Sequence, residues 1–102
     1  MVSNPFSLEG KTILVTGASS GIGRSTAIEC SKLGAKVVIT GRNAERLHET
    51  FTSLTGDGHI QVIADLSTVA GIEDLVSNLP ILDGRVSNAG YNVTQLVPYI
   101  KY

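Results

Sequence analysis

Residues 16–23 combine residue types and spacing that suit the binding of a phosphate group. The segment reads Thr-Gly-Ala-Ser-Ser-Gly-Ile-Gly. Glycines lack a Cβ atom, so backbone N–H groups at such a turn can approach a phosphate closely. If a helix begins here, its unpaired N–H groups and the positive end of its dipole attract the same anion. The segment therefore predicts a pyrophosphate-binding loop in which Ser19 and Ser20 add hydroxyl donors, and the alternative is a plain turn.

A P-loop of the form GxxxxGK[ST] is a second interpretation of residues 18–25. Ala18 stands where that motif has its first glycine, and Arg24 stands where it has lysine. A planar guanidinium does not replace a compact ammonium group. Asp65, at the end of an apolar run, could supply the metal-binding aspartate of such a site. A nucleotide triphosphatase is therefore kept as an alternative.

Short apolar, β-branched runs alternate with amphipathic stretches around this loop. Strands are expected at 11–16, 36–40, 59–64 and 82–87. Helices are expected at 21–33, from a cap at Asn43 to the glycines at 56–58, and from Ser67 or Thr68 to Pro80. This βαβαβαβ alternation predicts an α/β fold: a doubly wound, Rossmann-like parallel sheet with strand order 3-2-1-4 and three α/β/α layers. One face of the first helix is expected to be apolar and buried, with Ile22, Ala27, Ile28, Cys30 and Leu33 on it.

Length and composition fit a single domain over residues 1–102, with 42% hydrophobic residues and a net charge of -1. That charge gives no electrostatic reason to expect nucleic acid or an anionic membrane as a partner. With a single cysteine and neither CxxC nor HExxH, the sequence predicts no disulfide and no metal site. It also has no stretch of about 20 apolar residues and no signal-peptide pattern, so a cytoplasmic location is expected. The two histidines, His48 and His59, are expected to face solvent.

Four motifs, in chain order, resemble those of the short-chain dehydrogenases/reductases. They are the lead-in at 6–11, the glycine loop at 16–23, Ala-Asp-Leu at 64–66 and Asn-Ala-Gly at 88–90. The resemblance spans nearly the whole chain but covers only the N-terminal, dinucleotide-binding half of the family fold, so it implies a fold truncated relative to the family. It also implies the family reaction, which is hydride transfer between NADP(H) and a carbonyl or alcohol.

The same resemblance implies roles for individual residues. The adenine amino group would meet the Asp65 carboxylate, and the Leu66 backbone would support the ring. For Asp65, a helix-cap or turn aspartate is the alternative, and for Asn88 a turn asparagine. The residues implied to line the cofactor elsewhere are Gly17, Gly21, Ile22 and Gly23 at the pyrophosphate, Ser19 near the adenosine ribose, and Asn88, Ala89 and Gly90 along the adenosine side.

The end of the second expected strand decides between the two nicotinamide cofactors. An NAD(H) site would place an acidic residue there, about 20 residues after the glycine loop, to accept from the ribose 2′-hydroxyl. The chain instead carries Arg42, whose guanidinium can form charge-assisted bonds to a 2′-phosphate. NADP(H) is therefore favoured over NAD(H), with a solvated loop charge as the alternative role of Arg42.

No catalytic residue is assigned. A reductase of the resembled family uses a tyrosine with a lysine four residues later. Tyr91 is followed at that spacing by Gln95, and Tyr99 and Tyr102 lie too near the C-terminus. We therefore expect cofactor binding without turnover by this chain alone, with a non-catalytic structural or assembly fragment as the alternative.

A homodimer is expected through the fourth strand and the apolar residues 91–102. In the order 3-2-1-4 the fourth strand is an edge strand, and it carries Arg85 where a buried strand would be apolar. Edge strands expose unpaired N–H and C=O groups, and large apolar patches mark interfaces. A monomer whose tail folds back over its own sheet is the alternative.

Overall fold

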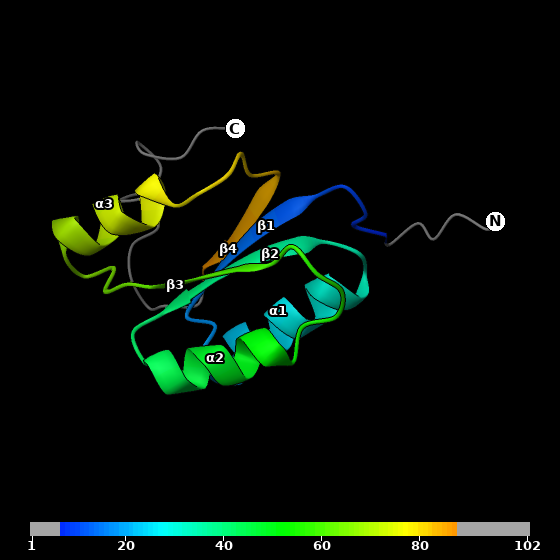
Figure 1. Cartoon of the computed structure of the whole chain (residues 1–102), viewed down its shortest axis with the longest axis horizontal. Helices are drawn as coiled ribbons and strands as arrows, with labels where there is room; N and C mark the ends of the chain where they lie inside the picture. The colour runs from blue at the N-terminus through cyan, green and yellow to red at the C-terminus, as the bar shows by residue number, and fades with distance from the viewer. Residues whose placement is uncertain (1–6, 88–102) are drawn as a thin grey trace.

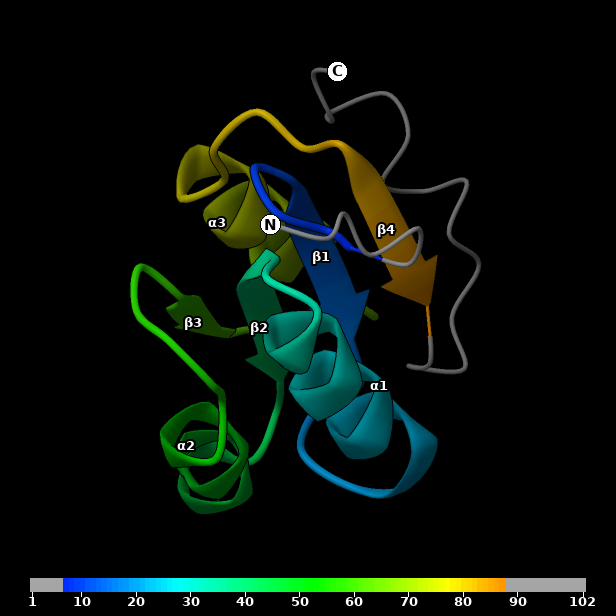
Figure 2. The same cartoon turned by 90° about the vertical axis from the view of Figure 1, so that its right-hand side faces the viewer.

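The computed structural model describes residues 7–87, which form a four-stranded parallel sheet with helices on both faces (Figures 1 and 2). The strands are β1 (Thr12–Thr16), β2 (Lys36–Gly41), β3 (Ile60–Ile63) and β4 (Gly84–Ser87). The helices are α1 (Gly21–Lys32), α2 (Ala44–Thr52) and α3 (Val69–Ser77). The strand order is β3-β2-β1-β4, and all three neighbouring pairs are parallel. The predicted fold class and strand order are therefore confirmed.

The strand side chains alternate between two cores because successive residues of a strand point to opposite faces. Figure 1 shows α1 and α2 on one side of the sheet and α3 on the other. Leu14 and Val38 are register partners on the α3 side, and Val15 and Ile39 are register partners on the side of α1 and α2. β1 and β2 are therefore apolar on both faces, as strands buried between two helix layers require.

Side-chain caps fix where two of the helices begin. The Asn43 side chain accepts a hydrogen bond from the Arg46 N–H at 3.0 Å and caps α2. The Thr68 side chain accepts one from the Gly71 N–H at 3.0 Å and caps α3. The cap predicted at Asn43 is confirmed, and of the two candidates for α3 the structure selects Thr68.

The buried face of α1 agrees only in part with the predicted one. Ala27 is buried as predicted, together with Gly23 and Ser31, whereas Ile22 is 77% exposed. The spacing of four residues in this set keeps small side chains against the sheet, where the helix lies close. Cys30 is half-buried at the margin of this core.

His59 also departs from the sequence expectation, since it does not simply face solvent. Its Nδ1 accepts a hydrogen bond from the Val37 N–H at 3.0 Å, and its Nε2 lies 2.7 Å from the Thr55 carbonyl oxygen. The ring therefore joins the loop before β3 to the start of β2. The Asn-Ala-Gly motif at 88–90 and the tail at 91–102 lie outside the described residues.

Candidate functional site

A pocket of about 630 Å³ lies at the carboxyl ends of the strands. This edge of an open parallel sheet is where ligands bind in doubly wound folds. The volume lies within the range of small-molecule sites. The pocket takes residues from the loop after β1, the β2–α2 junction and the segment after β3, namely Gly17, Ser19, Ser20, Thr40, Gly41, Arg42, Asn43, Arg46, Ala64 and Leu66.

The glycine loop is built as a tight turn against the start of α1. Gly17 and Gly21 adopt positive φ angles of 63° and 59°, which side chains other than glycine rarely tolerate. At Gly23, a Cβ atom would lie 2.0 Å from the Gly17 carbonyl oxygen. This close approach allows the helix to begin directly behind the loop.

The start of α1 carries no side-chain cap. Ser20 occupies the N-cap position in an extended conformation, but its side chain makes no capping hydrogen bond. The first-turn N–H groups of a helix have no partner within the helix. Both Ser20 and Ser19 border the pocket, so hydroxyl groups lie beside the positive end of the helix dipole.

Two guanidinium groups border one wall of the pocket. Arg42 follows β2 directly, and Arg46 lies in the first turn of α2, behind the Asn43 cap. Both side chains are exposed. No aspartate or glutamate is among the ten described residues that line the pocket. The wall is therefore suited to an anion.

Arg46 was not singled out from the sequence. A signal was present, because Arg46 follows Arg42 by four residues and sits one turn inside a helix capped at Asn43. The pair of arginines, rather than Arg42 alone, is what the structure brings to the pocket.

Asp65 lies close to this wall without lining it. Its Oδ1 accepts two hydrogen bonds from Ser67, one from the hydroxyl at 2.6 Å and one from the N–H at 2.9 Å. These bonds lower the pKa of the Asp65 carboxyl from its usual value, with a smaller contribution from the charge of Arg42. The turn role is thus present, and it leaves Oδ2 for an outside donor such as an adenine amino group.

Thr40 contributes a buried hydroxyl to the pocket region. Its side chain is fully buried, and its Oγ1 is the buried side-chain polar atom without a hydrogen-bond partner among residues 7–87. An unpaired buried hydroxyl costs free energy, and a polar ligand at this place would satisfy it. Together with the glycine loop and the two arginines, this group fits a nucleotide.

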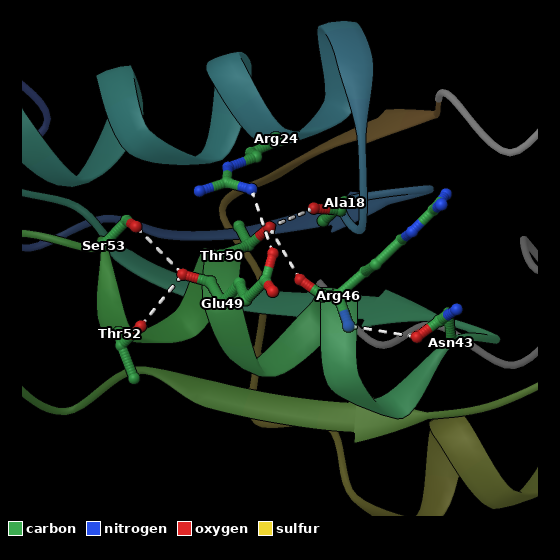
Figure 3. Close-up of polar contacts among 8 residues, drawn as sticks. All are labelled: Ala18, Arg24, Asn43, Arg46, Glu49, Thr50, Thr52 and Ser53. Atoms are coloured by element: carbon green, nitrogen blue, oxygen red, sulfur yellow. Dashed lines mark hydrogen bonds and ion pairs between the residues drawn. The ribbon is translucent and has the colours of Figure 1, made fainter.

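Arg24, the residue that stood for lysine in the P-loop interpretation, is directed elsewhere. Its Nη1 lies 3.6 Å from Oε2 of Glu49 on α2, as Figure 3 shows. Arg24 is not among the residues that line the pocket. This arrangement gives the P-loop alternative no support.

The site residues predicted from the sequence fall into three groups in the structure. Gly17, Ser19, Ser20, Arg42 and Leu66 are brought together around the pocket. Gly21, Ile22, Gly23 and Asp65 adjoin these residues in the chain but do not line it, and Asn88, Ala89 and Gly90 lie outside the described residues.

Within residues 7–87, no group of three His, Cys, Asp or Glu side chains could hold a metal ion. No helix in that part of the chain is long and apolar enough to cross a membrane.

A family model described as short chain dehydrogenase matches residues 11–101. One similar protein is a 3-oxoacyl-[acyl-carrier-protein] reductase of Rickettsia prowazekii, 43% identical over 83 residues, which are 81% of this chain and 34% of that protein. Another is an NADP-dependent 3-hydroxy acid dehydrogenase of Schizosaccharomyces pombe, 37% identical over 91 residues, or 81% of this chain and 35% of that protein.

Solved structures show the same likeness. L-sorbose reductase from Gluconobacter frateurii, complexed with NADPH and L-sorbose, matches with a TM-score of 0.77 and 35% identity over 84% of this chain and 35% of that one. Glucose dehydrogenase of Caenorhabditis elegans matches with a TM-score of 0.75 and 38% identity over 90% and 42% of the two chains. The chain thus spans about a third of the length of the curated relatives it matches.

Proposed function

The chain belongs to the short-chain dehydrogenase/reductase family, and from that membership we propose that it binds the adenosine end of NADP(H). The observation that carries the proposal is the pair of guanidinium groups, Arg42 and Arg46, in a pocket whose lining residues include no carboxylate. A 2′-phosphate can form charge-assisted hydrogen bonds with both. One relative is named as NADP-dependent, and one similar structure contains NADPH, which supports the same choice.

The pyrophosphate part of the proposal rests on the glycine loop. Gly17, Ser19 and Ser20 border the pocket next to the uncapped start of α1. Backbone N–H groups and hydroxyls at this place would bind the negative charge that the helix dipole favours. We further propose that Leu66 supports the adenine ring and that Asp65 accepts from its amino group through Oδ2.

When bound, the nicotinamide ring supplies the hydride chemistry of the family. The described residues would hold and orient the adenosine end of the cofactor. We propose that this chain alone does not carry out the reaction of the longer family enzymes between a carbonyl and an alcohol, since Tyr91 is followed four residues later by Gln95 rather than by lysine. An absorbance assay of NADPH with a panel of carbonyl compounds checks this proposal.

Isothermal titration calorimetry tests the cofactor choice by comparing adenosine 2′,5′-bisphosphate with AMP. The two ligands differ by the 2′-phosphate. Hydrogen bonds to charged groups contribute about 1.5–3 kcal/mol, so we expect the bisphosphate to bind about 10- to 150-fold more tightly. Arg42→Ala should remove most of this preference.

A matched control is Lys32→Ala, which removes one positive charge from the last turn of α1, at the other end of that helix from the loop. It should leave the preference unchanged. Equal affinity of the original chain for the two ligands would rule out the 2′-phosphate site. No binding of either ligand would favour the structural or assembly fragment.

Arg46→Ala is a separate test of the residue that the sequence did not reveal. Because the Arg46 side chain is exposed, solvent screens its charge, and we expect a loss of about threefold to tenfold in affinity for the bisphosphate. AMP affinity should hardly change. If AMP and the bisphosphate lose affinity equally, Arg46 does not contact the 2′-phosphate.

A further inference from the structure

Thr50, on the buried side of α2, connects that helix to the glycine loop. Its side chain is fully buried, and its Oγ1 donates a hydrogen bond to the Ala18 carbonyl oxygen at 2.8 Å (Figure 3). The carbonyl of Arg46 lies farther from the same hydroxyl, at 3.3 Å. A hydroxyl has one hydrogen to donate, so the shorter contact to Ala18 is the one that uses it.

Ala18 is held at both of its backbone polar groups. Its N–H donates to the Thr40 carbonyl oxygen at 3.1 Å, at the end of β2, and its C=O accepts from Thr50. The methyl group of Ala18 is itself fully buried. The residue is therefore fixed between the sheet and α2, directly before Ser19 and Ser20, which border the pocket.

The peptide that joins Ala18 to Ser19 gives this contact a consequence for binding. A trans peptide is planar, so its C=O and N–H point in opposite directions. The described part of the chain contains no cis peptide. The hydrogen bond from Thr50 holds the Ala18 carbonyl towards α2, so the Ser19 N–H points away from α2. If this peptide rotated, the Ala18 carbonyl oxygen would take the place of the Ser19 N–H. A carbonyl oxygen repels an anion, whereas the N–H group can donate a hydrogen bond to it.

We propose that Thr50 is a positioning residue for the pyrophosphate loop: its hydroxyl fixes the Ala18–Ser19 peptide in the orientation that presents the Ser19 N–H to an anion. This inference rests on the proposed function. A buried threonine hydroxyl costs free energy unless it is bonded. The shorter hydrogen bond of the Thr50 hydroxyl goes to Ala18 in the glycine loop, not to a residue of α2.

Two probes separate the loop from the arginine wall. Adenosine diphosphate has the pyrophosphate and no 2′-phosphate, whereas adenosine 2′-monophosphate has the reverse. Thr50→Val keeps the shape of the side chain and removes the hydroxyl. We expect it to weaken adenosine diphosphate binding by about twofold to tenfold, since one hydrogen bond contributes about 0.5–1.5 kcal/mol. Binding of the 2′-monophosphate should not change measurably.

Thr50→Ser restores the hydroxyl and should bind both probes as the original chain does. Thr52→Val is the matched control, because the Thr52 hydroxyl donates to the Glu49 carbonyl at 3.0 Å, within the same helix and on its exposed side (Figure 3). It should alter neither affinity. Binding is measured by calorimetry, and the fold of each variant is checked by circular dichroism.

Three outcomes would overturn the inference while leaving the proposed function in place. The first is adenosine diphosphate binding by Thr50→Val that is as tight as that of the original chain, and the second is an equal loss of affinity for both probes. The third is unfolding of both Thr50→Val and Thr50→Ala while Thr50→Ser folds, which would show a structural role alone. If the original chain binds neither probe, the proposed function fails and this inference fails with it.

Discussion

Asp65 carries its negative charge in a turn that the protein itself stabilises. Both hydrogen bonds to its Oδ1 come from Ser67, and they hold the pKa of this carboxyl below its usual value. An acid whose pKa is lower in the folded than in the unfolded chain stabilises the folded state above the unfolded pKa. This contribution is lost as the pH falls through the folded pKa.

We expect Asp65→Asn to flatten the acid end of the stability profile. The amide keeps an oxygen acceptor for Ser67 but does not titrate. The original chain should therefore lose more free energy of unfolding than the variant does when the pH falls from about 5 to about 3. Urea unfolding at several pH values measures this difference.

Ser67→Ala provides the companion variant, because it removes the stronger donor and leaves the carboxyl. Its profile should move towards that of Asp65→Asn. Identical profiles for the original chain and both variants would contradict the role assigned to this turn.

At the residue scale, the sequence predicted the part of the site that depends on backbone conformation. Gly17 and Gly21 have positive φ angles because the turn between neighbouring residues requires them. A glycine-rich turn of this kind is visible in the sequence. Thr50 and His59 were not predictable in the same way. Each bonds to a backbone group more than 20 positions away, so its partner is set by the folded chain.

At the scale of elements, the start of α3 is held against the chain that leads into it. Gly71 lies in the first turn of this helix, and a Cβ atom there would lie 1.8 Å from the Asp65 carbonyl oxygen. That oxygen is backbone and cannot move aside as a flexible side chain could. The turn from Asp65 to the Thr68 cap therefore requires glycine at this position.

Gly71→Ala should destabilise the chain by about 2–4 kcal/mol, because the turn must open or the helix must shift. Val69→Ala is the control. It lies in the same turn, is 64% exposed, and should change the free energy of unfolding by about 0.5 kcal/mol or less. Denaturant titrations of both variants give the comparison. A Gly71→Ala variant as stable as Val69→Ala would show that the close approach is not required.

The elements themselves were largely predictable, and their buried faces less so. Leu47 and Phe51 recur at helical spacing on α2 and do pack on the core. On α1 the large apolar residue Ile22 is exposed, while Ala27 and Ser31 are buried. Hydropathy favours large apolar side chains for a core, but here the short distance between helix and sheet admits only small ones.

At the scale of the whole molecule, β4 is an edge strand of the described sheet. It pairs with β1 on one side, and within residues 7–87 no strand pairs with its other side. Arg85, opposite Leu14 in the register, is exposed on this strand. Edge strands of a sheet are places where a strand of a second chain can pair.

We expect the chain to form a homodimer through β4 and residues 91–102. Sedimentation equilibrium at micromolar concentration should give about twice the monomer mass of 10.7 kDa. Deletion of residues 91–102 should shift the equilibrium towards monomer. A clean monomer mass that the deletion does not change would contradict this interface.

The topology was predictable because each step of it follows from a local rule. Right-handed crossovers between parallel strands, with a helix in each, leave few orders for four strands, and 3-2-1-4 is the one adopted. The second arginine of the pocket wall was not anticipated. Its position at the pocket depends on the direction that α2 takes after β2. The spacing of Arg42 and Arg46 in the sequence does not determine that direction.

Cys30 lies on α1 at the margin of the core, and burial raises the pKa of its thiol, with Glu29 adding to the effect. Thiolate is the species that reacts with alkylating agents, so the folded chain keeps its single cysteine slow to react near neutral pH. Unfolding returns the thiol to water and to its ordinary acidity. Iodoacetamide should therefore modify this residue faster in the unfolded than in the folded chain, so its alkylation rate follows unfolding without any added label.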